Sequence, residues 1–289
     1  HRGPSHSVFL LALLGPLAGW ALHRLFDDLD VSRVRWMVMA TLAFLSQPFL
    51  DVLTSYGTYL FWPVEPDPLA YSTLSIIDPI LTLTLAVGLG VALVSELDSR
   101  RRVIAGTLAV ALSLGYIAML VGFKWHATAV FEDEFERQNV EYSRLETHPG
   151  FFNSIFWVAY ADSGDSGDDF HIATYSLLDD DERVDILRVD KNTELIEPYL
   201  DDRRARTLVR FSRGFYSMRR EDGALVFEDL HIGRQDQWLG EDGRSFFRFV
   251  LIPDPDDPTR LHHIERVEGD PDEISSEMLR RYVERVLGE

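Results

Sequence analysis

The sequence predicts an α-helical membrane domain of about four transmembrane helices, followed by a soluble, β-rich α+β domain. One reason is a set of four long apolar stretches, whose only charged residue is Arg35 near the start of the second, all within residues 1–123. Another is charge, since residues 1–123 carry nine acidic and seven basic side chains, whereas residues 124–289 carry 38 acidic and 21 basic ones. A third is a series of short β-type runs between Gly-, Asp- and Pro-rich turns in the second half. We therefore expect two domains, 1–123 and 124–289.

The apolar stretches cover residues 8–22, 34–50, 79–95 and 103–123. A helix needs about 20 apolar residues to span a bilayer, with about 17 as the lower limit. The fourth stretch passes this test easily and the second and third are borderline, while the first passes only if residues 3–7 are included. Four such runs favour membrane insertion over the alternative, a soluble bundle with buried helices.

Arginines in the connections predict the orientation of these helices. The turn between the first two segments carries Arg24, Arg33 and Arg35, and residues 100–102 between the third and fourth are all arginine. The positive-inside rule places both turns in the cytoplasm. The start of the chain, the 52–74 connection without Lys or Arg, and everything after the fourth segment should then lie outside. In a bacterium, this predicts an inner-membrane protein with an extracytoplasmic C-terminal domain.

The second half has the pattern of a β-rich domain that does not bind nucleic acid. Strands are expected at residues 155–161, 170–178, 184–189, 207–211, 225–230 and 246–252, and a final helix at 271–287. The excess of carboxylates argues against binding to nucleic-acid phosphates. Because the sequence has no cysteine, disulfides, thiolate chemistry and Cys ligands are excluded.

Side chains that bind metals lie where the apolar segments begin or end. His1 and His6 precede the first segment, Asp51 ends the second, Asp78 begins the third, and His126 follows the fourth. With the topology above, all five lie at the same, outer face of the membrane. Histidine nitrogens and carboxylate oxygens together suit zinc or a similar divalent ion. These positions predict a shared metal site, with His126 as a further site residue.

Two local patterns refine this prediction. Gln47 and Asp51 are four residues apart, so they share one face if the second helix continues to Asp51. A helix that begins near Pro4 would let His1 fold back over the helix start to meet His6. The expected metal ligands are therefore His1, His6, Asp51 and Gln47.

The chemistry that such a site supports is hydrolysis. A divalent ion lowers the pKa of bound water towards neutrality and makes hydroxide for attack on an ester, amide or phosphoester. Arg2 would orient an anionic group of the substrate. Asp78 is a general base, a further ligand or a helix N-cap, and these alternatives remain open. Because the site would lie at the outer leaflet, the bilayer is the expected partner and a lipid-linked phosphoester the expected substrate.

Several motifs in this chain resemble the YdjM-like, LexA-regulated inner-membrane proteins, a family described as metal-dependent hydrolases. The matching stretches are residues 1–7, 48–58, 62–63 and 76–79, and in the acidic half residues 151–153, 175–179 and 211–216. The resemblance implies a multi-spanning protein with a divalent-metal centre. Members of the family usually have a further N-terminal Pro-Asp-x-Asp segment, and tend to have His where this chain has Gln47. Because the sequence opens on His1 rather than Met, we expect that upstream residues are missing.

The leading hypothesis is a membrane-bound, metal-dependent hydrolase that uses zinc. The competing hypothesis is a non-catalytic membrane protein whose metal site is structural or sensory. A transporter is a third hypothesis, since polar residues at membrane segments can also mark an ion path. Here they lie at segment ends rather than near the middle of the membrane, which argues against transport.

Overall fold

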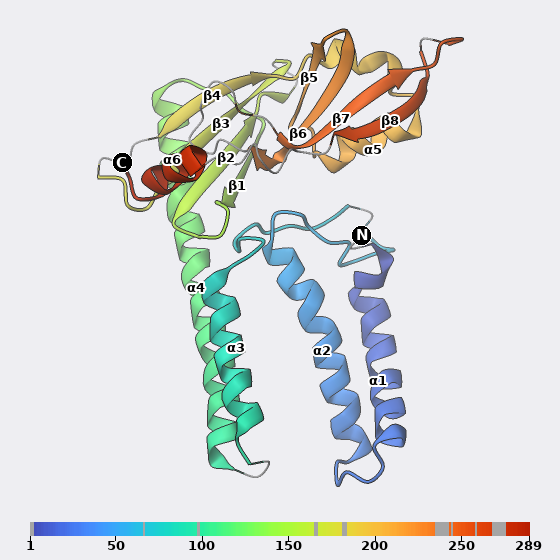
Figure 1. The fold of residues 1–289 in the computed structure, drawn as a ribbon, viewed down its shortest axis with the longest axis vertical. Coiled ribbons are helices and arrows are strands. Elements are labelled where there is room, and N and C mark those ends of the chain that lie inside the picture. The colour runs from blue at the N-terminus through green and yellow to red at the C-terminus, as the bar shows by residue number, and fades with distance from the viewer. Residues whose placement is uncertain are drawn as a thin grey trace. The chain divides into compact units, whose positions relative to one another are not determined.

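The computed structural model describes residues 3–65, 67–96, 99–164, 167–180, 184–234, 243, 245–257, 259–267 and 276–289 (Figure 1). The chain divides into two compact units, His1–Asp78 and Pro79–Glu289. Among the described residues, the first unit is helical, whereas the second contains four α-helices and two antiparallel sheets. The predicted fold class, membrane helices followed by a β-rich α+β domain, is confirmed.

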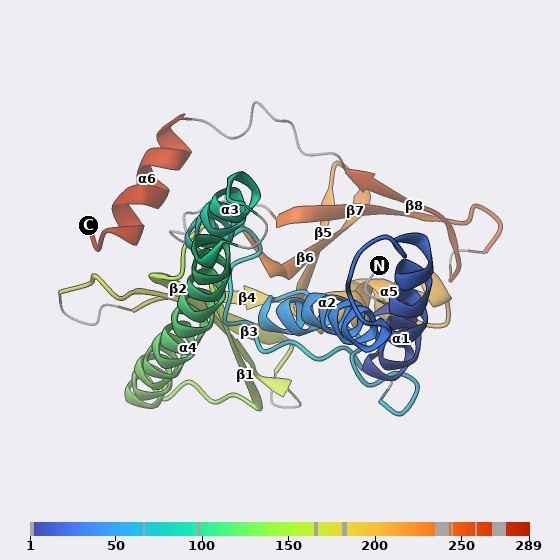
Figure 2. The same ribbon diagram turned by 90° about the horizontal axis from the view of Figure 1, so that it is seen from below.

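The first unit pairs two apolar helices through close backbone contact. Its elements are the 3₁₀ turn η1 (Pro4–His6), α1 (Val8–Leu25) and α2 (Arg33–Leu53). A Cβ on Gly15 would lie 2.6 Å from Cα of Thr41, and one on Gly19 would lie 2.3 Å from Cα of Met37. Small residues permit this kind of approach between membrane helices, and Figure 2 shows α1 beside α2.

The connection after α2 folds back over the ends of both helices. The amide of Val8 donates to the carbonyl of Leu60 at 2.9 Å, and the amide of Tyr71 donates to the carbonyl of Val52 at 2.6 Å. The hydroxyl of Ser7 donates to the carbonyl of Trp62 at 2.6 Å. The connection is rich in buried hydroxyl side chains, namely Thr54, Ser55, Thr58, Ser72, Thr73 and Ser75. It therefore forms a polar cover attached to one end of the helix pair.

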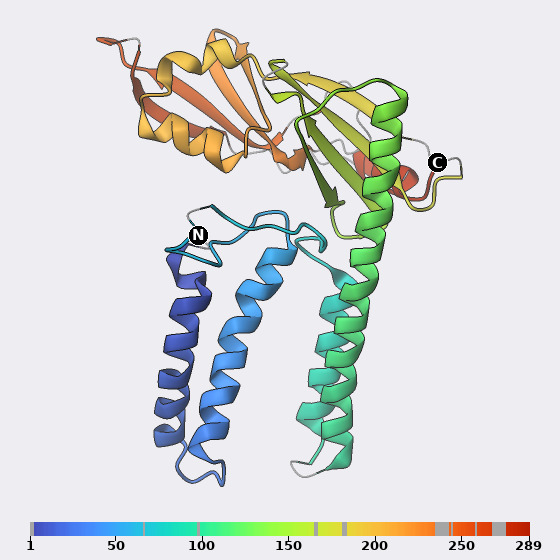
Figure 3. The same ribbon diagram turned by 180° about the vertical axis from the view of Figure 1, so that it is seen from behind.

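The second unit begins with α3 (Pro79–Val94) and α4 (Arg100–Arg137). Among the described residues, α1, α2 and α4 are long and apolar enough to cross a membrane. Only 17% of the most apolar 18-residue segment of each helix is buried. With 16 residues, α3 is a shorter apolar helix. Of the four helices predicted to span the membrane, three therefore meet the length criterion. In Figure 3, α4 runs past α3 to the first sheet, so the predicted domain boundary at 123/124 falls inside one continuous helix.

The first sheet is antiparallel with the strand order β1-β2-β3-β4 and is covered on both faces. Its strands are β1 (Arg144–Pro149), β2 (Phe156–Asp162), β3 (Asp169–Ser176) and β4 (Asp185–Asp190). On one face, Trp157 packs with Phe131 and Phe135 of α4. On the other, Phe156 packs in a cluster that includes Tyr282 of α6 (Ser276–Val286). Burial on both sides explains why β2 is an almost continuous apolar run.

The second sheet is also antiparallel, with the order β5-β6-β7-β8. Its strands are β5 (Tyr216–Glu221), β6 (Ala224–Arg234), β7 (Ser245–Pro253) and β8 (Leu261–Val267). Two 3₁₀ turns, η3 (Thr193–Leu195) and η4 (Glu197–Tyr199), lead into α5 (Arg203–Phe211). Ala205 and Leu208 of α5 pack on Met218 and Phe227 of the sheet. The second sheet and α5 therefore share a hydrophobic core that is separate from that of the first sheet.

Most of the strand predictions were correct. Five predicted runs correspond to β2, β3, β4, β6 and β7, and the predicted last helix corresponds to α6. The strand predicted at 207–211 was wrong, because these residues end α5. Asp202 caps that helix, and its apolar positions Ala205 and Leu208 follow helical spacing. The polar strands β1 and β5 were not predicted.

Candidate functional site

Three of the residues expected to bind metal meet at the capped end of α1 and α2. Nε2 of His6 lies 3.2 Å from Nε2 of Gln47 and 3.5 Å from Oδ2 of Asp51. The side chains of His6 and Asp51 are only 15% and 17% exposed. Because α2 continues to Leu53, Gln47 and Asp51 lie one turn apart on the same face. The structure thus brings together an imidazole, an amide and a carboxylate.

Hydrogen bonding around His6 directs one ring nitrogen towards its two neighbours. Nδ1 lies 3.0 Å from the hydroxyl of Ser5, which can accept its proton. That tautomer leaves the lone pair on Nε2, the atom nearest Gln47 and Asp51. A half-turn of the Gln47 amide would direct its oxygen to the same point. The donor set of one imidazole nitrogen and two oxygens fits a divalent ion of the zinc type.

The remaining predicted residues have different positions. His1 and Arg2 lie outside the described residues. Asp78 is buried, with 4% of its surface exposed, immediately before α3 begins at Pro79. His126 belongs to the second unit, where Nε2 lies 3.2 Å from the hydroxyl of Tyr175 on β3. The roles assigned to these four residues remain predictions.

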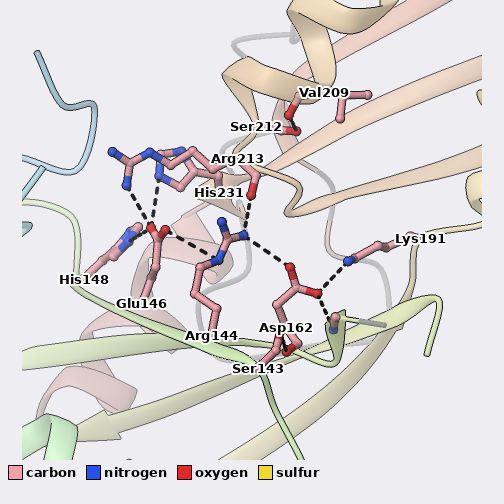
Figure 4. Close-up of polar contacts among 11 residues, drawn as sticks. Ser143, Arg144, Glu146, His148, Asp162, Lys191, Val209, Ser212, Arg213 and His231 are labelled. Atoms are coloured by element: carbon pink, nitrogen blue, oxygen red, sulfur yellow. Dashed lines mark hydrogen bonds and ion pairs between the residues drawn. The ribbon is translucent and has the colours of Figure 1, made fainter. Parts of the chain in front are cut away.

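A second cluster of possible ligands lies in the extramembrane part of the second unit. Glu146, His148 and His231 each present one ligand atom, and these atoms lie within 4.8 Å of one another. Oε2 of Glu146 is 3.4 Å from Nε2 of His148 and 3.8 Å from Nε2 of His231. Figure 4 shows these side chains gathered around the carboxylate of Glu146. By composition and spacing, the cluster could hold a metal ion.

Two strands from different sheets position this second cluster. Glu146 and His148 are alternate residues of β1, so they lie on one face of the first sheet. His231 comes from β6, where the pairing with β7 shifts register between Asp229 and Arg234. Such irregularities change the direction of side chains and often accompany functional sites. The β1 pair could have been found as an i, i+2 pattern in a strand, but no sequence signal links it to His231.

Burial and charge determine the protonation states in this cluster. Burial lowers the pKa of His148, although the hydrogen bond and the charge of Glu146 act in the opposite direction. Burial, with the nearby His148 and Arg213, lowers the pKa of His231 well below its usual value. Burial alone would raise the pKa of Glu146, but the hydrogen bond from His148 and the surrounding positive groups lower it. At neutral pH the cluster therefore contains neutral imidazoles and an ionised carboxylate.

Arginine side chains surround the same carboxylate. Nη1 of Arg213 lies 3.1 Å from Oε2 of Glu146, and Nε of Arg144 lies 3.9 Å from Oε1. Arg144 also donates to the carbonyl of Arg213 and to the carboxylate of Asp162. Without an ion, these contacts form an ion-pair network that links β1 to the segment before β5.

Comparison with known protein families yields a match to the membrane part of the chain. The family described as YdjM inner membrane protein matches residues 1–126, which include α1 to α3 and most of α4. The resemblance inferred from the sequence motifs is thereby confirmed for this part of the chain. No curated protein matches the chain, and no solved structure matches it. The match includes His6, Gln47 and Asp51 but ends before the first sheet.

Proposed function

We propose that this chain, which matches the YdjM inner membrane protein family over residues 1–126, is a membrane-bound, metal-dependent hydrolase. The single observation that carries the proposal is the convergence of Gln47 and Asp51 on Nε2 of His6, at 3.2 Å and 3.5 Å. His6 comes from η1, whereas Gln47 and Asp51 come from α2. They would hold a divalent ion of the zinc type, together with His1.

Each residue near this site would have a separate role in hydrolysis. A bound ion would supply hydroxide at neutral pH and polarise the bond that is attacked. Ser5 would accept the proton of Nδ1 and so leave Nε2 of His6 free to coordinate. Arg2 would bind an anionic group of the substrate. Asp78 would accept the proton of the attacking water or act as a further ligand.

The proposed location defines the substrate class. Arginines near one end of the helices support a cytoplasmic position for the α1–α2 and α3–α4 turns. The capped end of α1 and α2 would then lie at the outer leaflet, and the sheets would be extracytoplasmic. A phospholipid or other lipid-linked phosphoester would reach such a site by diffusion in the bilayer. An alkaline phosphatase fusion after Glu289 should be active and one at Arg101 inactive, whereas the reverse pattern would overturn this topology.

Metal analysis tests the site itself. Full-length protein purified in detergent should lose one metal equivalent on His6→Ala or Asp51→Asn substitution. The matched control is His23→Ala, which removes a histidine in the last turn of α1. It should leave the metal content unchanged. Equal metal content in His6→Ala and wild-type protein would refute the proposed centre.

A substrate panel tests catalysis separately. Phosphoesters and carboxylic esters, with lipid-linked examples in mixed micelles, are compared with and without a chelator. Hydrolysis should require the metal and should be lost in Asp51→Asn but kept in His23→Ala. Bound metal without chelator-sensitive hydrolysis would instead support a non-catalytic protein with a structural or sensory ion.

A further inference from the structure

We infer that Glu146, His148 and His231 form a second divalent-metal site, which joins the two sheets of the extramembrane domain. The inference is independent of the proposed hydrolase centre, because it uses other residues in the other compact unit. The ligand class is a borderline transition-metal ion such as zinc. Two histidines and one carboxylate are a common protein donor set for that ion.

The distances within the cluster agree with coordination. Zinc bonds of about 2.0–2.1 Å in a tetrahedron place neighbouring donor atoms about 3.3–3.4 Å apart. Oε2 of Glu146 lies 3.4 Å from Nε2 of His148 and 3.8 Å from Nε2 of His231. A shift of His231 by a few tenths of an ångström would bring its Nε2 to the donor separation expected around zinc.

His231 supplies a separate reason to expect a ligand. Its side chain is 2% exposed, and neither ring nitrogen has a hydrogen-bond partner among the described residues. A buried polar group without a partner is unfavourable, so such groups usually mark a strained or functional position. An ion between His231, Glu146 and His148 would satisfy Nε2 of His231.

Arg213 does not prevent this arrangement. Its Nη1 lies 3.1 Å from Oε2 of Glu146, the same oxygen that would coordinate. A carboxylate oxygen has two lone pairs, so Oε2 can accept from Arg213 and bind an ion at the same time. Positively charged neighbours weaken cation binding, and we therefore expect this site to bind metal less tightly than a closed structural zinc site.

Joining β1 to β6 would give the ion a structural effect. Glu146 and His148 belong to the first sheet and His231 to the second, and the two sheets share no strand pairing among the described residues. An ion that binds only the folded arrangement stabilises it by mass action. Zinc should therefore raise the melting temperature of the extramembrane domain and protect β1 and β6 from amide hydrogen exchange.

The experiment uses full-length, chelator-treated protein in detergent that is titrated with zinc. His231→Phe and Glu146→Gln should each lose one metal equivalent and the zinc-dependent rise in melting temperature. The control His171→Phe changes a histidine of β3 outside the cluster and should keep both. In protein with His6→Phe, the metal that depends on His231 should remain, so failure of the hydrolase centre can be distinguished from failure of this site.

Two results would overturn the inference. One is wild-type metal content in both His231→Phe and Glu146→Gln. The other is the absence of a zinc-dependent shift in melting temperature or hydrogen exchange of β1 and β6 in the wild-type protein. This second measurement needs no variant, so it decides the question even if His231→Phe fails to fold. Cobalt substitution adds a spectroscopic check, because visible absorption of a four-coordinate ion should disappear with Glu146→Gln.

Discussion

A buried ion pair between α6 and the first sheet provides a quantitative test of the fold. Nη1 of Arg285 lies 2.7 Å and 3.0 Å from the two oxygens of Asp179, and its Nε lies 3.2 Å from Oδ2 of Asp185. The side chains of Arg285 and Asp179 are only 4% and 3% exposed. Because water cannot replace either partner, removal of one charge leaves the other buried without its counter-ion.

Arg285→Met should lower the free energy of unfolding of the extramembrane domain by about 3–5 kcal/mol, the usual cost of a broken buried pair. Methionine keeps most of the apolar stem, so the loss reports the charge rather than packing. The control Arg280→Met lies on the same helix, where Arg280 is 57% exposed and pairs with Glu277 and Glu284. Solvent screens an exposed pair, so this variant should remain close to wild type.

Urea unfolding of full-length protein in detergent, followed by near-ultraviolet circular dichroism, measures both variants. Hydrogen exchange of peptides from β3 and α6 assigns the loss to this domain. The double variant Arg285→Met/Asp179→Leu should recover most of the stability, because the remaining carboxylate, Asp185, has 30% of its side chain exposed and can be hydrated. The reasoning is refuted if Arg285→Met and Arg280→Met differ by less than about 1 kcal/mol, the range of an exposed pair.

Other predictions concern the helix pair and α5. Gln47→His should tighten zinc binding, since imidazole is a better zinc ligand than an amide, and competition with a chromophoric chelator measures this. Gly19→Ala should destabilise the packing of α1 on α2 by about 1–3 kcal/mol in thermal unfolding, whereas Gly90→Ala, whose new Cβ would meet no atom within 4 Å, should have little effect. Asp202→Ala removes the N-cap of α5 and should cost about 0.5–2 kcal/mol at pH 7. The hydrogen bond from Arg204 lowers the pKa of Asp202 from 3.8 to about 2, so this contribution is present above pH 3.8 and is lost as pH falls through 2, which urea midpoints over that range would check.

Much of the membrane domain could be predicted because its determinants are local. Hydropathy identifies helices that are long and apolar enough to cross a bilayer. The match of residues 1–126 to an inner-membrane protein family agrees with a membrane location. The i, i+4 spacing placed Gln47 and Asp51 on one helix face, as found. Their proximity to His6 was expected from topology, because antiparallel neighbouring helices bring the start of one to the end of the next.

The extramembrane domain was less predictable because polar strands have little local signal. Residues 144–149 alternate charged and apolar side chains too irregularly to identify β1, and residues 207–211 are β-branched enough to suggest a strand. Capping by Asp202 and the burial of Leu208 against the second sheet make that segment a helix instead. Tertiary packing overrode a weak local preference.

The sequence by itself determined the membrane helices, the acidic β-rich half and the candidate ligands at the ends of the first two apolar segments. These depend on hydrophobic length, charge and helical periodicity, which act over a few turns of chain. Only the tertiary structure decided that His231 meets Glu146 and His148, with an Nε2 to Oε2 distance of 3.8 Å to Glu146. That contact joins strands of different sheets, and it depends on a register shift in β6 and on sheet packing. Long-range contacts of this kind have no periodic signature in the sequence, because they form only when the separate elements pack together.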